Sequence, residues 1–197
     1  MTVKVTFKAQ VYPTENPYKV AICIRNMIDQ NYKVGRREAI ENYEIKNPLN
    51  LKELETRFPD CEITVQNDVD EIVKKRNIEN ENGKSKTITE NISVSGNQYL
   101  LRAFHSYIRR EEIIDTAYSA LSDGLSHDRK KVKFYLNKQV AYAKRVNFPA
   151  DVEALGSVSV QIEADSEEKI EKIIDWVTPP TKNGVPLYEK RIEDIFD

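Results

Sequence analysis

Hydrophobic and polar residues alternate along residues 3–11, which predicts a strand with one buried face. Residues 12–17 contain two prolines and break this strand. Asn16 followed by Pro17 is typical of a helix start, because Asn caps free amides and proline lacks an amide that would be unpaired there. Hydrophobic residues at helical spacing continue to Met27, so the sequence predicts a first helix here.

Residues 29–57 form a mostly polar segment after the predicted first helix. Within it, Asn50 and Glu53 resemble a capping box, which predicts a short helix. Alternation over 61–65 predicts a second strand. The segment 67–86 is rich in Asn, Glu and Lys and predicts a mobile hairpin connection.

A third strand is predicted to end at Gly96. From Leu100 to Leu121 the hydrophobic positions recur near the helical period, which predicts one long helix or two helices. The polar residues 109–112 are the weak point of that pattern, and Gly124 is its expected C-terminal cap.

Residues 131–148 contain no glycine or proline and many aromatic or β-branched residues, which indicates a strand. Because strands rarely exceed about ten residues, we expect a bend near 137–139. Alternation over 158–162 predicts another strand, and Asp165 is expected to cap a last helix that two prolines end.

This order of elements favours an α+β fold with two layers, in which helices cover one face of a largely antiparallel sheet. The length suits a single domain over residues 1–188 with a polar insertion near 29–57. Residues 189–197 are expected to form a tail or docking helix.

Charge is distributed unevenly, although the net charge is only −2. Residues 97–145 carry 10 basic and 5 acidic side chains, whereas residues 146–197 carry 5 basic and 12 acidic ones. Two cysteines in hydrophobic patterns fit buried positions rather than a disulfide or zinc scaffold. The N-terminus lacks a hydrophobic signal core, so we expect a cytoplasmic protein with no membrane segment, metal or cofactor.

The basic middle of the chain contains the most unusual segment, Phe134-Tyr-Leu-Asn-Lys-Gln139. A continuous strand would place Lys133, Tyr135 and Arg145 on one face, where cations contact phosphates and a ring stacks on a base. The candidate RNA-binding residues are Arg129, Lys130, Lys131, Lys133, Tyr135, Asn137, Lys138, Gln139, Lys144 and Arg145. Basic residues on a strand face are also commonly only solvated, so both interpretations stay open.

Two alternatives do not involve nucleic acid. Exposed strand edges and polar insertions suit a homodimeric assembly protein. Lys138 falls on the hydrophobic side of its strand and must therefore either leave the core at a bend or pair with a carboxylate, for which Asp175 and Glu15 are the candidates. Such a pair is either structural or the centre of an enzyme.

Several segments together resemble an uncharacterised archaeal protein family. They are Tyr12-Pro-Thr-Glu15, Ile108-Arg-Arg-Glu-Glu-Ile-Ile-Asp-Thr-Ala117, Phe134-Tyr-Leu-Asn-Lys-Gln139, Arg145-Val-Asn-Phe148 and Asp175-Trp-Val-Thr-Pro-Pro-Thr181. The resemblance covers roughly residues 1–28 and 58–188. It implies RNA binding, which is predicted for the family, and a fold like that of the large-subunit ribosomal protein that binds 5S RNA. Tyr118 stands where the family pattern has arginine, which weakens an anion site on that helix.

Overall fold

The computed structural model describes residues 3–33, 46–81, 89–149, 153 and 155–196. Its centre is a five-stranded sheet with the order β2-β3-β1-β5-β4, in which every neighbouring pair is antiparallel. The strands are β1 (Lys4–Val11), β2 (Thr64–Gln66), β3 (Glu90–Gly96), β4 (Lys131–Asn137) and β5 (Ser157–Glu163).

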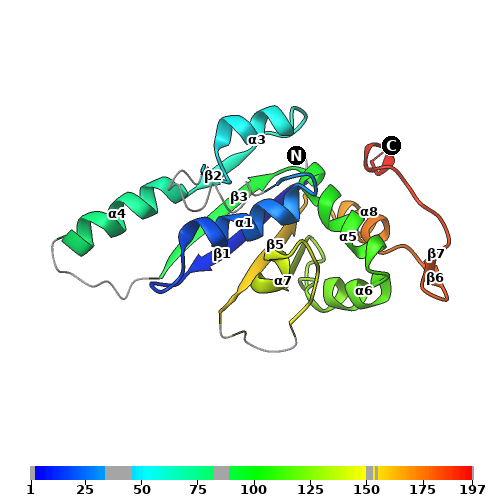
Figure 1. The fold of residues 1–197 in the computed structure, drawn as a ribbon. Helices are drawn as coiled ribbons and strands as arrows, with labels where there is room; N and C mark the ends of the chain where they lie inside the picture. The colour runs from blue at the N-terminus through cyan, green and yellow to red at the C-terminus, as the bar shows by residue number, and fades with distance from the viewer. Residues whose placement is uncertain (1–2, 34–45, 82–88, 150–152, 154, 197) are drawn as a thin grey trace.

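Helices lie over one face of this sheet (Figure 1). They are α1 (Pro17–Ile28), α3 (Leu51–Arg57), α4 (Val69–Glu81), α5 (Arg102–Arg110), α6 (Ile114–Asp123), α7 (Lys138–Tyr142) and α8 (Glu167–Val177). Figure 1 shows α1 across the sheet, with α5, α6 and α8 grouped on the right, α4 on the left and α3 above α1. A small hairpin of β6 (Thr181–Lys182) and β7 (Val185–Pro186) follows α8.

The core lies between the helices and the inward face of the sheet. Val5, Phe7, Ala9 and Val11 of β1 are buried, whereas the residues that alternate with them are exposed or half-buried. Phe104 of α5 stacks on Phe134 of β4 with ring centroids 5.2 Å apart. The predicted α+β fold with one covered sheet face is therefore confirmed; the likeness to the ribosomal protein stays a prediction.

The helix predictions hold at several boundaries. The side chain of Asn16 accepts hydrogen bonds from the first turn of α1, as expected. The long helical pattern is split into α5 and α6 at the predicted weak point, where Glu112 has a positive φ of 56°. The last helix begins one residue later than predicted, because Ser166 and not Asp165 caps it.

The prediction of a hairpin connection over 67–86 is wrong, because most of this segment is helix α4. Of the α4 side chains that the structure describes, Val69 and Ile72 in the first turns are the ones buried in the core. Arg76 then donates hydrogen bonds to three carbonyl groups at and just after the end of β1. Helical periodicity was hidden because the rest of α4 is polar. Residues 82–86 lie outside the described residues.

The second strand is shorter than predicted. Pairing with β3 begins only at Thr64, although Cys61 and Ile63 are buried as their alternation suggests.

The predicted long strand over 131–148 ends at Asn137, where the chain turns into α7. The cause is local: the Asn137 side chain accepts a hydrogen bond from the backbone N–H of Val140 and so caps a helix. The expected bend is confirmed, but the strand does not resume after it. Gln139 and Arg145 therefore do not continue the face that Lys133 begins.

The outer edge of β4 is covered by other parts of the chain. Lys133 N donates to the Gly124 carbonyl at 2.9 Å, Ser126 N donates to the Lys131 carbonyl, and Asn137 N donates to the Asn147 carbonyl. Gly124 does sit at the end of α6, but its φ of −83° needs no glycine. Its missing side chain matters because a Cβ there would lie 2.1 Å from the Lys133 carbonyl oxygen.

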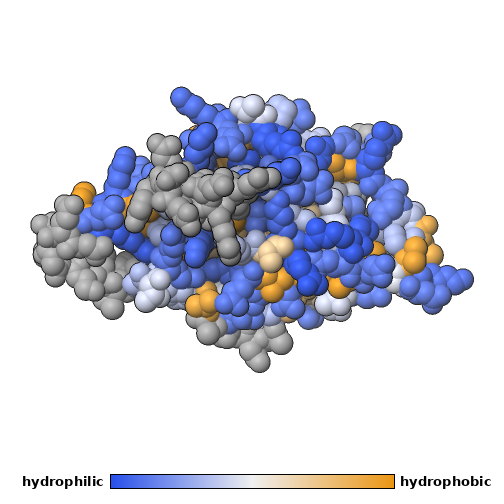
Figure 2. Space-filling model, in the orientation of Figure 1, coloured by the Kyte–Doolittle hydropathy of each residue, from blue (hydrophilic) through white to orange (hydrophobic). Residues whose placement is uncertain are grey.

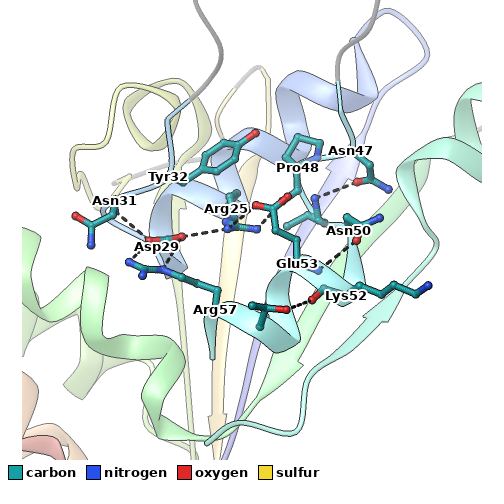
Figure 3. A network of polar contacts seen from close by, with 12 residues as sticks. Arg25, Asp29, Asn31, Tyr32, Asn47, Pro48, Asn50, Lys52, Glu53 and Arg57 are labelled. Atoms are coloured by element: carbon teal, nitrogen blue, oxygen red, sulfur yellow. Dashed lines mark hydrogen bonds and ion pairs between the residues drawn. The ribbon is translucent and has the colours of Figure 1, made fainter. Parts of the chain in front are cut away.

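A buried ionic network fastens α3 to α1 (Figure 3). Arg25, only 2% exposed, donates to Asp29, Glu53 and the Pro48 carbonyl. Arg57 of α3 donates twice to the same Asp29 carboxylate. Whether this region is an insertion stays a prediction, and residues 34–45 lie outside the described ones.

The C-terminal residues contact α5 and α8. The Trp176 indole donates to the Lys190 carbonyl at 3.1 Å, and Ile192 and Ile195 are buried. The expected docking helix is only a 3₁₀ turn over Ile192–Asp194. The domain boundary at residue 188 stays a prediction. None of the helices in the described part of the chain is long and apolar enough to cross a membrane.

Candidate nucleic-acid interface

The sheet face opposite the helices, which we call the open face, carries almost entirely polar side chains. Strand alternation sends hydrophobic residues inward and leaves these outward. The outward residues are Lys4, Thr6, Lys8, Gln10, Thr64, Gln66, Asn91, Ser93, Ser95, Lys131, Lys133, Tyr135, Asn137, Ser157, Ser159, Gln161 and Glu163.

Register aligns these residues in rows across the sheet. One row runs Gln66, Ser93, Lys8, Ser159, Tyr135, with each residue paired to the next. The row contains one amide, two serine hydroxyls, one cation and one aromatic ring, and of these Ser93 is buried. These groups suit contacts with phosphates, riboses and base faces.

The five strands place four lysines and one glutamate on the open face, a net charge of +3, and the loop residue Glu153 adds one carboxylate beside Lys8 and Lys133. Lys131 lies 2.8 Å from Glu163, and this hydrogen bond raises the pKa of Lys131 and lowers that of Glu163. Lys4 sits opposite Glu163 on the other side. Within the described residues, no carboxylate forms an ion pair with Lys8 or Lys133.

Four of the ten predicted RNA-binding residues reach this face. They are Lys131, Lys133, Tyr135 and Asn137. Tyr135 is 47% exposed, and Lys133 Nζ lies 5.3 Å from the centroid of its ring. Lys4 and Lys8 were missed because they lie far away in the sequence, and only the pairing of β1 with β5 brings them close. Their alternation with buried residues was the available signal.

The other predicted residues are dispersed. Lys130 is exposed in the turn before β4, and Gln139 is exposed on α7. Lys144 donates to the carbonyls of Gln30 and Tyr32. Arg145 is 3.6 Å from Glu111, on the helical side of the molecule. The ten predicted residues therefore do not form one continuous patch.

Four of the ten basic side chains of residues 97–145 form ion pairs with carboxylates of the acidic segment 146–197. Arg129 Nη2 lies 2.8 Å from Glu171 of α8. The pairs between the two segments are Arg102 with Glu193, Arg109 with Glu189, Arg129 with Glu167 and Glu171, and Lys131 with Glu163. Part of the positive charge of residues 97–145 is therefore balanced within the molecule by the negative charge of residues 146–197.

Lys138 is buried and points to the helical side, away from the open face. Its Nζ donates to both carboxylate oxygens of Glu15, at 2.9 and 3.0 Å, and to the Gln10 carbonyl at 2.8 Å. Asp175 is not its partner, because Asp175 binds Lys190. Three acceptors satisfy the three N–H bonds of the ammonium group, which indicates a structural pair.

Three cavities are relevant to function. The one beside Lys138 and Glu15 has a volume of about 570 Å³. A second, of about 710 Å³, lies between α6 and α8 and contains Arg129 and Glu171, which bind each other. The third, of about 730 Å³, lies on the open face and contains Lys8, Lys133 and Tyr135. Among the described residues, no cluster of His, Cys, Asp and Glu is arranged to hold a metal.

Comparison with known proteins agrees with the resemblance seen in the sequence. A family model described as "RNA binding" matches residues 4–166. A UPF0201 protein of Methanosarcina acetivorans is 33% identical over 98% of this chain and 94% of its own length. This chain belongs to the UPF0201 family. Another UPF0201 protein, from Methanocaldococcus jannaschii, is 30% identical over 97% of this chain and 81% of its own length.

Solved UPF0201 structures share the fold. The crystal structure of a UPF0201 protein from Methanococcus jannaschii superimposes with a TM-score of 0.56 at 28% identity, covering 94% of this chain and 99% of that one. A second UPF0201 crystal structure has a TM-score of 0.53 at 24% identity, over 93% of this chain and 99% of the other.

Proposed function

We propose that this UPF0201 protein binds RNA through the open face of its sheet. The observation that carries the proposal is the placement of Lys4, Lys8, Lys131 and Lys133 among outward hydroxyls and amides, with Glu163 as the one outward carboxylate of the five strands. The match to a family model described as "RNA binding" covers all of these residues.

The chemistry of the face fits a polyanion with exposed hydroxyls. Lysines contribute attraction to phosphates whatever the base sequence. Serine, threonine and glutamine side chains both donate and accept hydrogen bonds, as the 2′-hydroxyl of RNA does. We infer a binding role rather than a catalytic one, because Lys138 and Glu15, the pair best suited to acid–base chemistry, satisfy each other.

The test is a charge reversal with a matched control. Fluorescence anisotropy with a labelled single-stranded RNA is compared for the wild type, the variant K4E/K8E/K133E and the control K19E/K52E/K74E. The control removes the same charge from exposed lysines of α1, α3 and α4. We expect the first variant to lose binding by at least about 100-fold at low salt, and the control to lose far less.

Salt dependence provides a second readout. Each lost phosphate contact should reduce the slope of log K against log salt by about 0.7 for a single strand, so three should reduce it by about 2. Equal losses in both variants would overturn the open face as the interface. Equal affinity for a DNA strand of the same sequence would overturn RNA as the preferred ligand.

A further inference from the structure

The cavity on the open face has the size and lining of a site for one or two unpaired nucleotides. Its volume of about 730 Å³ lies within the range of about 300–1,000 Å³ typical of small-ligand sites. It spans four strands, since Asn91 of β3 is paired with Gln10 of β1, and Lys8 is paired with Ser159 of β5, the neighbour of Tyr135.

Two tyrosines line this cavity, and they differ in how firmly their side chains are held by neighbouring residues. Tyr12 is held on several sides: its hydroxyl donates to Gln10 Oε1 at 3.1 Å, and Lys138 Nζ lies 5.1 Å from its ring centroid. Gly156, with a φ of 69°, lies so close that a Cβ would be 3.1 Å from the ring. Tyr12 is therefore a fixed wall of the cavity.

Tyr135 is the platform on which a base can stack. It lies on edge strand β4, and 47% of it is exposed. Lys133 Nζ is 5.3 Å from its ring centroid, close enough for a phosphate bound by the ammonium group to bring its base onto the ring. Stacking of this kind contributes about 1–3 kcal/mol per base and tolerates any base.

Side-chain amides supply groups that can contact a base edge. The Tyr12 hydroxyl donates a hydrogen bond to the amide oxygen of Gln10, and no described residue accepts a hydrogen bond from the NH₂ group of Gln10. Asn91 lies directly opposite on the neighbouring strand. An amide presents both donors and an acceptor, which match the Watson–Crick edges that unpaired bases expose.

We propose that the cavity binds a splayed, unpaired nucleotide, so that the protein selects single-stranded or looped RNA over duplex RNA. This inference rests on the RNA binding proposed above. A duplex keeps its bases stacked inside the helix, and the deep major groove of A-form RNA does not admit side chains. A base therefore reaches Tyr135 only from a strand that is unpaired at that point.

The experiment measures the affinity for a labelled 12-nucleotide RNA alone and annealed to its complement, at one salt concentration. The variants are Y135A, the ring-conserving Y135F and the control Y118A, which removes a tyrosine that is 54% exposed on α6. Circular dichroism verifies that each variant is folded.

We expect the single strand to bind at least about tenfold more tightly than the duplex. Y135A should weaken single-strand binding by about 5- to 150-fold, the range that stacking energies imply, without changing the salt slope. Y135F and Y118A should bind like the wild type.

The two proposals fail in different ways. Equal binding of both RNAs, with Y135A like the wild type and K4E/K8E/K133E inactive, would overturn the nucleotide cavity and leave the RNA-binding face intact. Absence of binding to either RNA by the wild type would overturn both.

Discussion

Lys138 Nζ lies 2.9 Å from Glu15 Oε2, and this ion pair joins the start of α7 to the turn after β1. The Lys138 side chain is 4% exposed and that of Glu15 is 14% exposed. Glu15 also accepts a hydrogen bond from the backbone N–H of Tyr12. The pair therefore fixes the turn that carries one wall of the cavity on the open face.

Removing either partner should destabilise the fold. K138M leaves the Glu15 carboxylate without its cation and should cost about 3 kcal/mol of unfolding free energy in urea titration. The double variant K138M/E15Q should recover part of that loss. For comparison, K172M breaks an exposed pair with Glu168 and should cost about 0.5 kcal/mol or less. A loss as small for K138M as for K172M would contradict the structural role.

Asp29 should make the protein sensitive to acid. Burial acts to raise the pKa of Asp29, but hydrogen bonds from Arg57 and the backbone N–H of Asn31, with the charge of Arg25, lower it overall. The ionised carboxylate thus contributes stability above its unfolded pKa of about 3.9, and this is lost as pH falls through the lower folded value.

D29N should therefore be less stable than the wild type at pH 7, and the difference should shrink below about pH 4. Chemical denaturation at several pH values measures this convergence. D60N, at an exposed position, serves as the control. A constant difference between D29N and the wild type at every pH would refute the assignment.

His105 should be neutral at physiological pH. It stacks on Trp176 with ring centroids 4.4 Å apart, and burial, reinforced by the Arg109 charge, lowers its pKa to about 4 although Glu189 opposes this. Because the unfolded histidine has a pKa of about 6.5, the stability of the neutral ring is lost as pH falls from about 6.5 toward 4.

The measurements are an NMR titration of the ring and the pH profile of unfolding. H105F keeps an aromatic stack and should lose less stability than the wild type over that interval, whereas H127Q, in an exposed turn, should leave the profile unchanged. A His105 pKa near 6.5 would contradict the burial of its ring.

Gly124 should not tolerate a side chain. G124A would place Cβ 2.1 Å from the Lys133 carbonyl oxygen and force α6 and β4 apart, at a cost of about 2 kcal/mol or more. Gly184 has open space around it and a φ of 77°, so G184A should cost only about 1 kcal/mol from backbone strain. Thermal unfolding compares the two, and equal losses would exclude the steric cause.

The pattern of hydrophobic residues was enough to predict β1, α1 and β5, because each buries one complete face. Helix α4 was missed because its buried hydrophobic residues, among those the structure describes, lie in the first turns and the remaining sequence is mostly polar. The end of β4 depended on one hydrogen bond of Asn137, which alternation does not encode.

The candidate site was harder to predict than the fold. Lys133 and Tyr135 were found because they alternate on one strand, but Lys8 joins them only through the register of β1 with β5. Arg129 looked available because its acidic partners lie about forty residues later in the chain. The charges of neighbouring residues in the sequence therefore predicted too much basic surface near residue 129. They did not reveal the basic surface that forms where β1, β5 and β4 pair.

The covered edge of β4 restricts how two copies of this protein can meet. Backbone groups of Lys131, Lys133 and Asn137 that point outward are already bonded to the chain's own loops. At this edge only a short stretch around Tyr135 is left for an incoming strand, too little to extend the sheet through β4 into a second molecule. A homodimer, still a prediction, would then meet through another surface, such as the hydrophobic patch that Figure 2 shows at the β6–β7 hairpin, where Val185 and Leu187 are exposed.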